Sequence, residues 1–130
     1  MAKKLAVWGG TFLVAVLASL TPSDSRVEAQ GGVDAAIHSA AVTHGVQEWR
    51  LRCLAQRESS FFPGAYNAAG YHGLYQWDWP SWREVSPRAG YAGASPYNAW
   101  SAAHVTAWAI SQGQGWRWPP LRWCGGQGAW

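Results

Sequence analysis

Residues 58–76 read Glu-Ser-Ser-Phe-Phe-Pro-Gly-Ala-Tyr-Asn-Ala-Ala-Gly-Tyr-His-Gly-Leu-Tyr-Gln, and this stretch decides the fold of the chain. It is crowded with glycine, proline, asparagine and aromatic residues, a composition that excludes a long helix. Gly64, Gly70 and Gly73 permit the backbone to approach another segment closely. We therefore expect a loop or an irregular hairpin here, between two helices.

Helical periodicity flanks this stretch on both sides. Before it, apolar spacing predicts a helix over 33–44 and a second helix over 46–57. After it, Ser95 as N-cap and Pro96 at the first helical position predict a third helix that runs to Gly113. Apolar residues extend around most of this third helix, so we expect it to be the central one.

The composition fits one small globular domain and excludes several classes of protein. The 130 residues are 48% hydrophobic and 13% charged. With 11 Trp, 5 Tyr and 3 Phe, the chain has more aromatic surface than a small core can hide, which favours a flat ligand such as a sugar ring or a base. A formal net charge of +3 is too weak to indicate nucleic-acid binding.

The N-terminus is typical of a secretory signal peptide. A short basic stretch over residues 1–4 precedes an apolar run from Leu5 to Leu20, and Val27-Glu28-Ala29 is a suitable cleavage site. Cleavage there divides the chain into a leader, 1–29, and a mature domain, 30–130. The alternative is an uncleaved membrane anchor, because the apolar run is about as long as a short spanning helix. Either way, we expect the domain to be secreted or held in the cell envelope.

Two cysteines, Cys53 and Cys124, stand far apart in the sequence. In a small exported domain such a pair predicts a disulfide, here one that fastens an extended C-terminal tail to the second helix. Two free thiols are the alternative. The histidines are dispersed and no Cys-x-x-Cys or His-Glu-x-x-His spacing occurs, so we expect no metal site and no cofactor.

Glu58 has the surroundings of a general acid. It ends an apolar helix, where the backbone dipole is negative, and Phe61 and Phe62 follow at once. Both features disfavour the ionised form, and a carboxyl that stays protonated is what a general acid needs. An exposed glutamate without function at a helix end is the alternative interpretation.

The chain resembles the soluble lytic transglycosylase family of the lysozyme-like superfamily in the order and spacing of four segments: Glu58-Ser59-Ser60-Phe61, Pro63-Gly64-Ala65-Tyr66-Asn67, Gly70, and Gly73-Leu74-Tyr75-Gln76. In that family a Glu-Ser pair closes the catalytic helix and a Gly-Leu-x-Gln turn lines the sugar cleft. The resemblance implies a mainly α, small lysozyme-like α+β domain in which an irregular loop or hairpin lines the cleft.

The resemblance also implies a role for each matching residue. Glu58 would protonate the bridging oxygen between N-acetylmuramic acid and N-acetylglucosamine in peptidoglycan glycan strands and give a 1,6-anhydro product. Ser59 would position the substrate and Asn67 would brace the cleft. Sugars would contact Gly73, Leu74, Tyr75 and Gln76. Candidates for stacking on sugar faces are Tyr66, Tyr71, Tyr75, Trp77 and Trp79.

Each of these roles has a structural alternative, and so does the overall activity. Ser59 could be a helix-end polar group, Leu74 a core residue, and Asn67 and Gln76 turn residues. Asp78 is either the second carboxylate of a lysozyme-type hydrolase or the N-cap of a helical segment after it.

Two non-enzymatic functions also compete with the transglycosylase. A glycan-binding module without catalysis would use the same aromatic loop, and only the position of Glu58 separates it from an enzyme. A secreted inhibitor or structural protein would explain the two cysteines. It would not explain the spacing from Glu-Ser to Gly-Leu-x-Gln.

Overall fold

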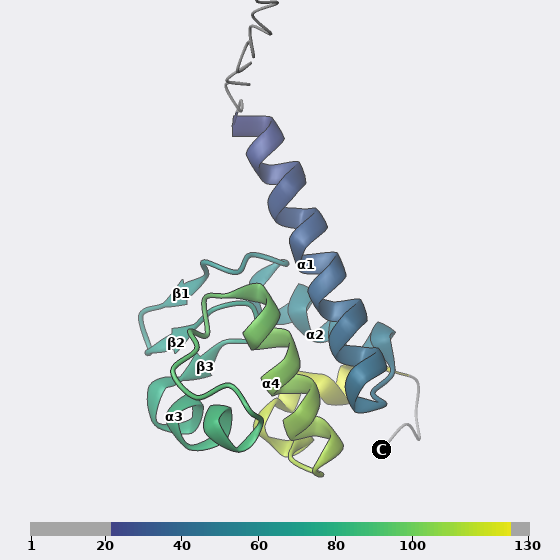
Figure 1. Ribbon diagram of the computed structural model, residues 1–130, viewed down its shortest axis with the longest axis vertical. Coiled ribbons are helices and arrows are strands. Elements are labelled where there is room, and N and C mark those ends of the chain that lie inside the picture. The colour runs from purple at the N-terminus through teal and green to yellow at the C-terminus, as the bar shows by residue number, and fades with distance from the viewer. Residues whose placement is uncertain (1–21, 126–130) are drawn as a thin grey trace, which may run out of the picture.

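The computed structural model describes the backbone of residues 22–125 and the side chains of residues 32–125. Its helices are α1 (Pro22–His44), α2 (Glu48–Ser59), α3 (Trp79–Arg88) and α4 (Ala99–Ser111), followed by the short 3-10 helices η1 (Gly115–Arg117) and η2 (Pro119–Trp123). The strands are β1 (Tyr66–Asn67), β2 (Tyr71–His72) and β3 (Trp77–Asp78). The protein is thus mainly helical, with a small sheet at one side of the helices (Figure 1). It is a small α+β domain, as expected.

Helix α4 is central, as its sequence predicts. Every side chain from Ser101 to Ala107 is buried, and α1 packs along it (Figure 1). The core residues of α1 are Val33, Ala36, Ile37, Ala40 and Ala41. Because alanine is frequent on both contacting faces, the two helices can approach closely.

The start of α4 differs from the prediction. The N-cap is Asn98, whose side-chain oxygen accepts a hydrogen bond from the Ser101 N–H at 3.0 Å. Ser95 instead accepts one from the Tyr97 N–H at 3.1 Å, which closes a local turn before the helix. The prediction of Ser95 as N-cap is therefore wrong, because both side chains can cap and the chain uses the later one.

Helix α1 begins earlier than the predicted 33–44. It starts at Pro22, which a first helical turn tolerates, and continues through Gly31 and Gly32. Glycine costs a helix about 1 kcal/mol relative to alanine and does not by itself end one. Most of the predicted signal peptide, residues 1–21, lies outside the described residues. None of the helices over residues 22–125 combines the length and the apolar character that crossing a membrane requires.

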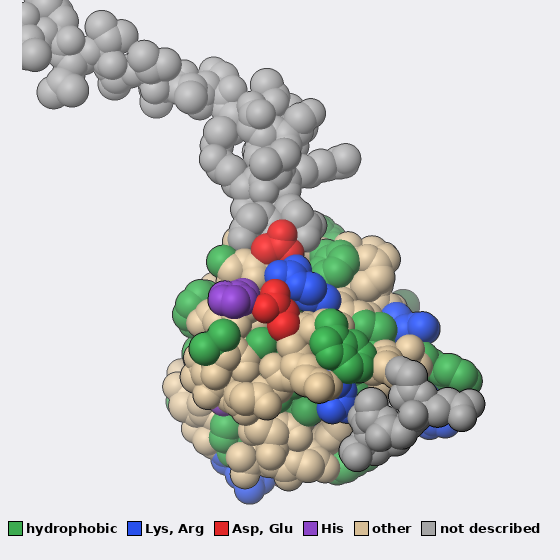
Figure 2. Space-filling model, turned by 90° about the vertical axis from the view of Figure 1, so that its right-hand side faces the viewer, with side chains coloured by type: hydrophobic (Ala, Val, Ile, Leu, Met, Phe, Trp, Pro, Cys, Tyr) green, Lys and Arg blue, Asp and Glu red, His purple; other side chains and the backbone are tan. Residues whose placement is uncertain are grey.

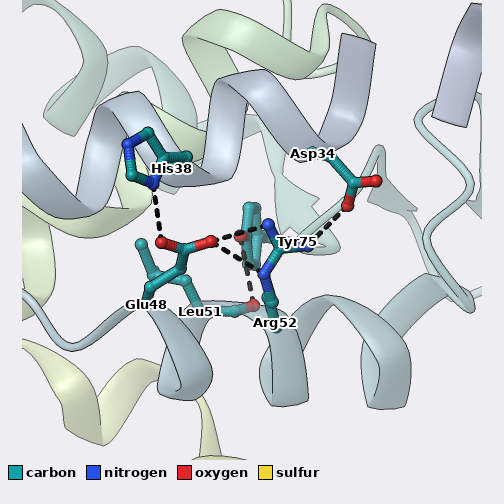
Figure 3. A network of polar contacts seen from close by, with 6 residues as sticks. All are labelled: Asp34, His38, Glu48, Leu51, Arg52 and Tyr75. Atoms are coloured by element: carbon teal, nitrogen blue, oxygen red, sulfur yellow. Dashed lines mark hydrogen bonds and ion pairs between the residues drawn. The ribbon is translucent and has the colours of Figure 1, made fainter. Parts of the chain in front are cut away.

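A polar network joins α2 to α1 on one face of the molecule, where acidic, basic and histidine side chains gather (Figure 2). Figure 3 shows Arg52 of α2 between Glu48 and Asp34, with His38 on the far side of Glu48. The Arg52 Nε donates to Glu48 at 2.9 Å, and the His38 ring lies 2.8 Å from the other Glu48 oxygen. Hydrogen bonds from His38 and Arg52 lower the pKa of Glu48. These side chains are partly exposed, so the network orients α2 more than it stabilises the fold.

A second polar contact between α1 and α4 is partly buried. The His104 Nδ1 lies 3.3 Å from the His44 Nε2, and its Nε2 lies 3.1 Å from the Ser39 hydroxyl. Burial lowers the pKa of both histidines. His104 therefore has a packing role, which is the default that its dispersed position in the sequence suggests.

The C-terminal tail is helical rather than extended. Residues 115–123 form η1 and η2, and the side chains of Trp118 and Leu121 are buried. The expectation of an extended strap is therefore wrong, because consecutive three-residue turns bury these side chains while an extended chain would alternate them. The predicted disulfide is confirmed: Cys53 is bonded to Cys124, with their Cα atoms 5.6 Å apart.

Replacing both Cys53 and Cys124 by alanine should lower the free energy of unfolding by about 2–5 kcal/mol, because the bond closes a long loop in the unfolded chain. Urea denaturation with and without a reducing agent measures the effect. The reductant should shift the midpoint of the wild-type protein and leave that of the variant unchanged. If the reductant left the wild-type midpoint unchanged, a stabilising disulfide would be contradicted.

Candidate functional site

Glu58 lies in the last turn of α2, directly before a sharp change in chain direction. Ser60 and Phe61 both have left-handed backbone conformations, with φ of 52° and 61°. Their N–H groups bond the carbonyls of Gln56 and Ala55 at 3.0 and 3.3 Å and so satisfy the end of the helix. Left-handed conformations are uncommon outside glycine and cluster at functional sites.

The Glu58 carboxyl is half-buried and has no polar partner among the residues that the structure describes. Among residues 32–125 it forms no hydrogen bond and no ion pair. Burial raises the pKa of this carboxyl above its usual value of 4.5. Desolvation therefore favours the protonated form without help from a neighbouring charge, which is a suitable environment for a proton donor.

Ser59 joins the end of α2 to the segment Gly73–Gln76. Its hydroxyl lies 2.8 Å from the Leu74 carbonyl oxygen and 3.1 Å from that of Ala55, and it donates to both. Ser59 and Leu74 are 15 residues apart in the sequence. In the folded chain, the Glu-Ser pair is thus in direct contact with the Gly-Leu-Tyr-Gln turn. Their contact supports a structural role for Ser59, and its role toward a substrate stays a prediction.

The turn Gly73–Gln76 is built on a close contact with the loop before α4. Gly73 has a φ of +81°, and a Cβ added there would lie 1.9 Å from the Pro96 carbonyl oxygen. Only glycine fits this position. The Gln76 side chain donates to the carbonyl of Gly73 at 2.9 Å. Gln76 therefore acts as a turn residue, the structural alternative to its predicted contact with sugars.

Tyr75 is a core residue, and its predicted contact with sugars is wrong. Its side chain is fully buried, its hydroxyl donates to the Leu51 carbonyl at 3.2 Å, and burial raises its pKa. Figure 3 shows it beneath the polar network of α1 and α2. The turn directs this side chain inward, where the hydroxyl finds a backbone acceptor.

Leu74 and Trp77 are likewise buried, so neither presents its side chain to a ligand. The Trp77 Nε1 donates to the Thr106 hydroxyl at 3.0 Å, which fastens β3 to α4. Gly73 is buried as well. These predicted contacts are corrected for one reason: the turn is packed against the loop before α4, against α2 and against Trp118.

Three predicted aromatic residues do lie at the surface. Tyr66, Tyr71 and Trp79 are 65%, 43% and 38% exposed. Tyr66 and Trp79 belong to an aromatic patch around His72, whose ring centroid lies 5.4 and 5.1 Å from theirs. Tyr97 completes the patch at 5.5 Å, with its hydroxyl on the His72 Nδ1. Tyr97 was not predicted from the sequence. It reaches the patch because its neighbour Pro96 contacts Gly73, and nothing in the sequence indicates that contact.

Asn67 and Asp78 both bond the backbone of their own turns. The Asn67 oxygen accepts from the Ala69 N–H at 2.8 Å. Asp78 is the N-cap of α3, and its Oδ1 accepts from the Ser81 N–H at 2.9 Å, which confirms one of its two interpretations. Within residues 32–125, no three His, Cys, Asp or Glu side chains are grouped in a way that could hold a metal ion.

Gly73→Ala should be far more destabilising than Gly70→Ala. Both positions have a positive φ, but a Cβ at Gly70 meets nothing within 4 Å. Gly70→Ala should therefore cost only the conformational strain, about 1–2 kcal/mol. Gly73→Ala adds an overlap with a backbone oxygen and should cost more than about 4 kcal/mol or prevent folding. Equal losses in urea denaturation would show that the contact with Pro96 is not tight.

Glu58→Gln should stabilise the protein at alkaline pH. The folded state disfavours the ionised carboxyl, so wild-type stability falls as the pH rises past 4.5 and reaches its lower level above the raised pKa. Glutamine does not ionise. Thermal unfolding should give the variant a higher Tm at pH 8 and the same Tm below pH 4.5. Glu84→Gln, at an exposed position on α3, is the control and should show little gain at any pH.

Comparisons with known proteins identify no relative of this chain: no family model matches it, and neither a curated protein nor a solved structure does. The likeness to the lytic transglycosylases therefore rests on the residues named above. What the site can do has to be inferred from its geometry.

Proposed function

We propose that the protein is an extracytoplasmic peptidoglycan lytic transglycosylase with a lysozyme-like fold, and that Glu58 is its only catalytic acid and base. The observation that carries the proposal is the half-buried Glu58 carboxyl, unpaired and with a raised pKa, at the end of α2. Ser59 holds that helix end against the Gly-Leu-Tyr-Gln turn, so the two segments on which the family resemblance rests are in contact.

A single carboxyl suffices for this reaction. Protonated Glu58 gives its proton to the glycosidic oxygen, and the bond from that oxygen to C1 of the muramoyl sugar breaks as positive charge develops on the ring. The carboxylate then takes the proton of the 6-hydroxyl of the same sugar, whose oxygen attacks C1. The products are a 1,6-anhydro sugar and a free hydroxyl on the leaving sugar, and Glu58 is protonated again.

The role of Asp78 favours this mechanism over hydrolysis. A hydrolase needs a second carboxylate as base or nucleophile. One Asp78 oxygen is already the acceptor at the start of α3, and the helix depends on it as its cap. A carboxylate committed to a helix cap is less suited to activating water.

The aromatic patch of Tyr66, His72, Trp79 and Tyr97 supports a sugar substrate. Exposed tyrosine and tryptophan rings offer flat apolar faces with polar edges, which suit the faces of pyranose rings. A glycan-binding module without catalysis would use the same patch. Cleavage therefore has to be tested separately from binding.

The decisive measurement is mass spectrometry of the fragments released from purified cell wall. Wild-type protein should release 1,6-anhydromuropeptides. Glu58→Gln should reduce the rate by a factor of about a hundred or more, the usual scale for loss of a general acid, while wall binding persists. Asp78→Asn is the matched control, because asparagine caps a helix as well as aspartate does, and it should keep most of the rate.

Two other outcomes would replace the proposal. Release of reducing-end muramic acid, abolished by Asp78→Asn, would make the protein a lysozyme-type hydrolase. Wall binding without cleavage at any pH, or full activity of Glu58→Gln, would rule out the proposed catalysis by Glu58. Binding without cleavage would leave a glycan-binding module.

A further inference from the structure

The C-terminal 3-10 helices form a hollow that sequence reasoning did not identify. It has a volume of about 480 Å³ and is lined by Gly115, Trp116, Trp118, Pro119 and Arg122. A smaller hollow shares Trp118 with it and is lined by Tyr71, Gln76, Trp77, Asp78, Ser81, Arg117 and Trp118. We call the two together the arginine groove. Its lining includes Gln76, in the turn beside α2, and Arg122.

The groove is fixed to the turn through its shared wall. Trp118 is buried, and its Nε1 donates to the Tyr75 carbonyl oxygen at 2.9 Å. On the sheet, Tyr71 stands directly opposite Asp78, and directly opposed residues share a face. Tyr71 and Asp78 both line the smaller hollow, so the groove borders the sheet on the face opposite to that of Tyr66 and His72.

Two arginines in the groove are held in place by hydrogen bonds to neutral groups. The Arg117 Nε donates to the Gln114 side-chain oxygen at 2.9 Å, and the Arg122 Nε donates to the Pro119 carbonyl at 3.1 Å. Each bond reaches three residues back and orients the guanidinium. Within residues 32–125, neither arginine forms an ion pair with an acidic side chain.

The walls of the groove are mainly apolar. Trp116 is 72% exposed, and the Arg117 guanidinium lies 4.8 Å from its ring centroid, a cation–π contact that further limits the motion of both. The acidic residue in the lining is Asp78, and one of its oxygens is committed to the Ser81 N–H. The groove therefore presents two oriented cations beside an indole surface.

We propose that the arginine groove binds the carboxylates of the peptide stems on a peptidoglycan strand, while the glycan itself lies along the sheet. This inference rests on the proposed function and names the part of the substrate that the groove recognises. Guanidinium groups suit carboxylates because they can donate two parallel hydrogen bonds. A volume of about 480 Å³ is within the range of sites for small ligands. Unpaired, oriented arginines lose little conformational freedom when they bind.

The test measures binding apart from cleavage. In the Glu58→Gln background, affinities are compared for soluble glycan strands with peptide stems and for the same strands after an amidase has removed the stems. Strands with stems should bind about tenfold tighter, the scale of one charge-assisted hydrogen bond, and the difference should shrink as salt is added. The double change Arg117→Gln and Arg122→Gln should remove the difference and leave binding of stripped strands unchanged.

Arg83→Gln is the matched control. Arg83 is exposed on α3 and lies 5.6 Å from the Trp79 ring centroid, outside the groove, so its loss removes one charge, as the loss of Arg122 alone does, and should keep the tenfold ratio. Arg122→Gln alone, at an exposed position, should lower the ratio with an unchanged Tm, which separates binding from stability.

Equal affinity for both kinds of strand would overturn the inference, and so would an equal effect of Arg83→Gln. The proposed function fails in a different way. If wild-type protein does not cleave wall but the arginine-dependent preference persists, the groove stands and the transglycosylase does not. If the wild-type protein cleaves wall but shows no preference for strands with stems, the transglycosylase stands and the groove does not.

Discussion

The contact between Gly73 and the Pro96 carbonyl is the constraint on which the rest of the domain depends. It sets the turn Gly73–Gln76 directly against the loop that leads into α4, with no room for a side chain. From this position the turn bonds two further layers: the Leu74 carbonyl accepts from Ser59 on α2, and the Tyr75 carbonyl accepts from Trp118 between η1 and η2. The candidate acid, the sheet and the C-terminal segment are therefore all positioned by one turn.

The same packing accounts for the unfavourable features around Glu58. A desolvated carboxyl and two left-handed residues after it each cost stability, and such features persist only where the surrounding structure fixes them. The turn supplies that support, because its Leu74 carbonyl accepts from Ser59 in the last turn of α2 and the fully buried Tyr75 donates to the Leu51 carbonyl in the first turn. The end of α2 is held in place by contacts that involve no substrate.

Features set by local chemistry could be predicted from the sequence. The central α4, the disulfide and the cap at Asp78 follow from apolar patterning, cysteine usage and the preference of aspartate for N-caps. The directions of the tyrosines could not, because strands of two residues are too short for alternation to show which side chain is buried. Tyr75 points inward and Tyr71 outward through long-range packing. Likewise, only the folded chain brings Tyr97 to His72.

Both ends of the C-terminal segment are joined to parts of the structure that contact α2. Cys124 is bonded to Cys53 on that helix, and Trp118 bonds the backbone of Tyr75, whose hydroxyl bonds Leu51 on the same helix. The lining of the arginine groove includes Trp118, so the groove is built on the segment that these two bonds attach to α2 and to the turn. A strand bound there by its peptide stems would have its glycan fixed relative to the acid without any closing motion. Such fixed geometry suits a reaction in which one carboxyl must serve two oxygens in turn.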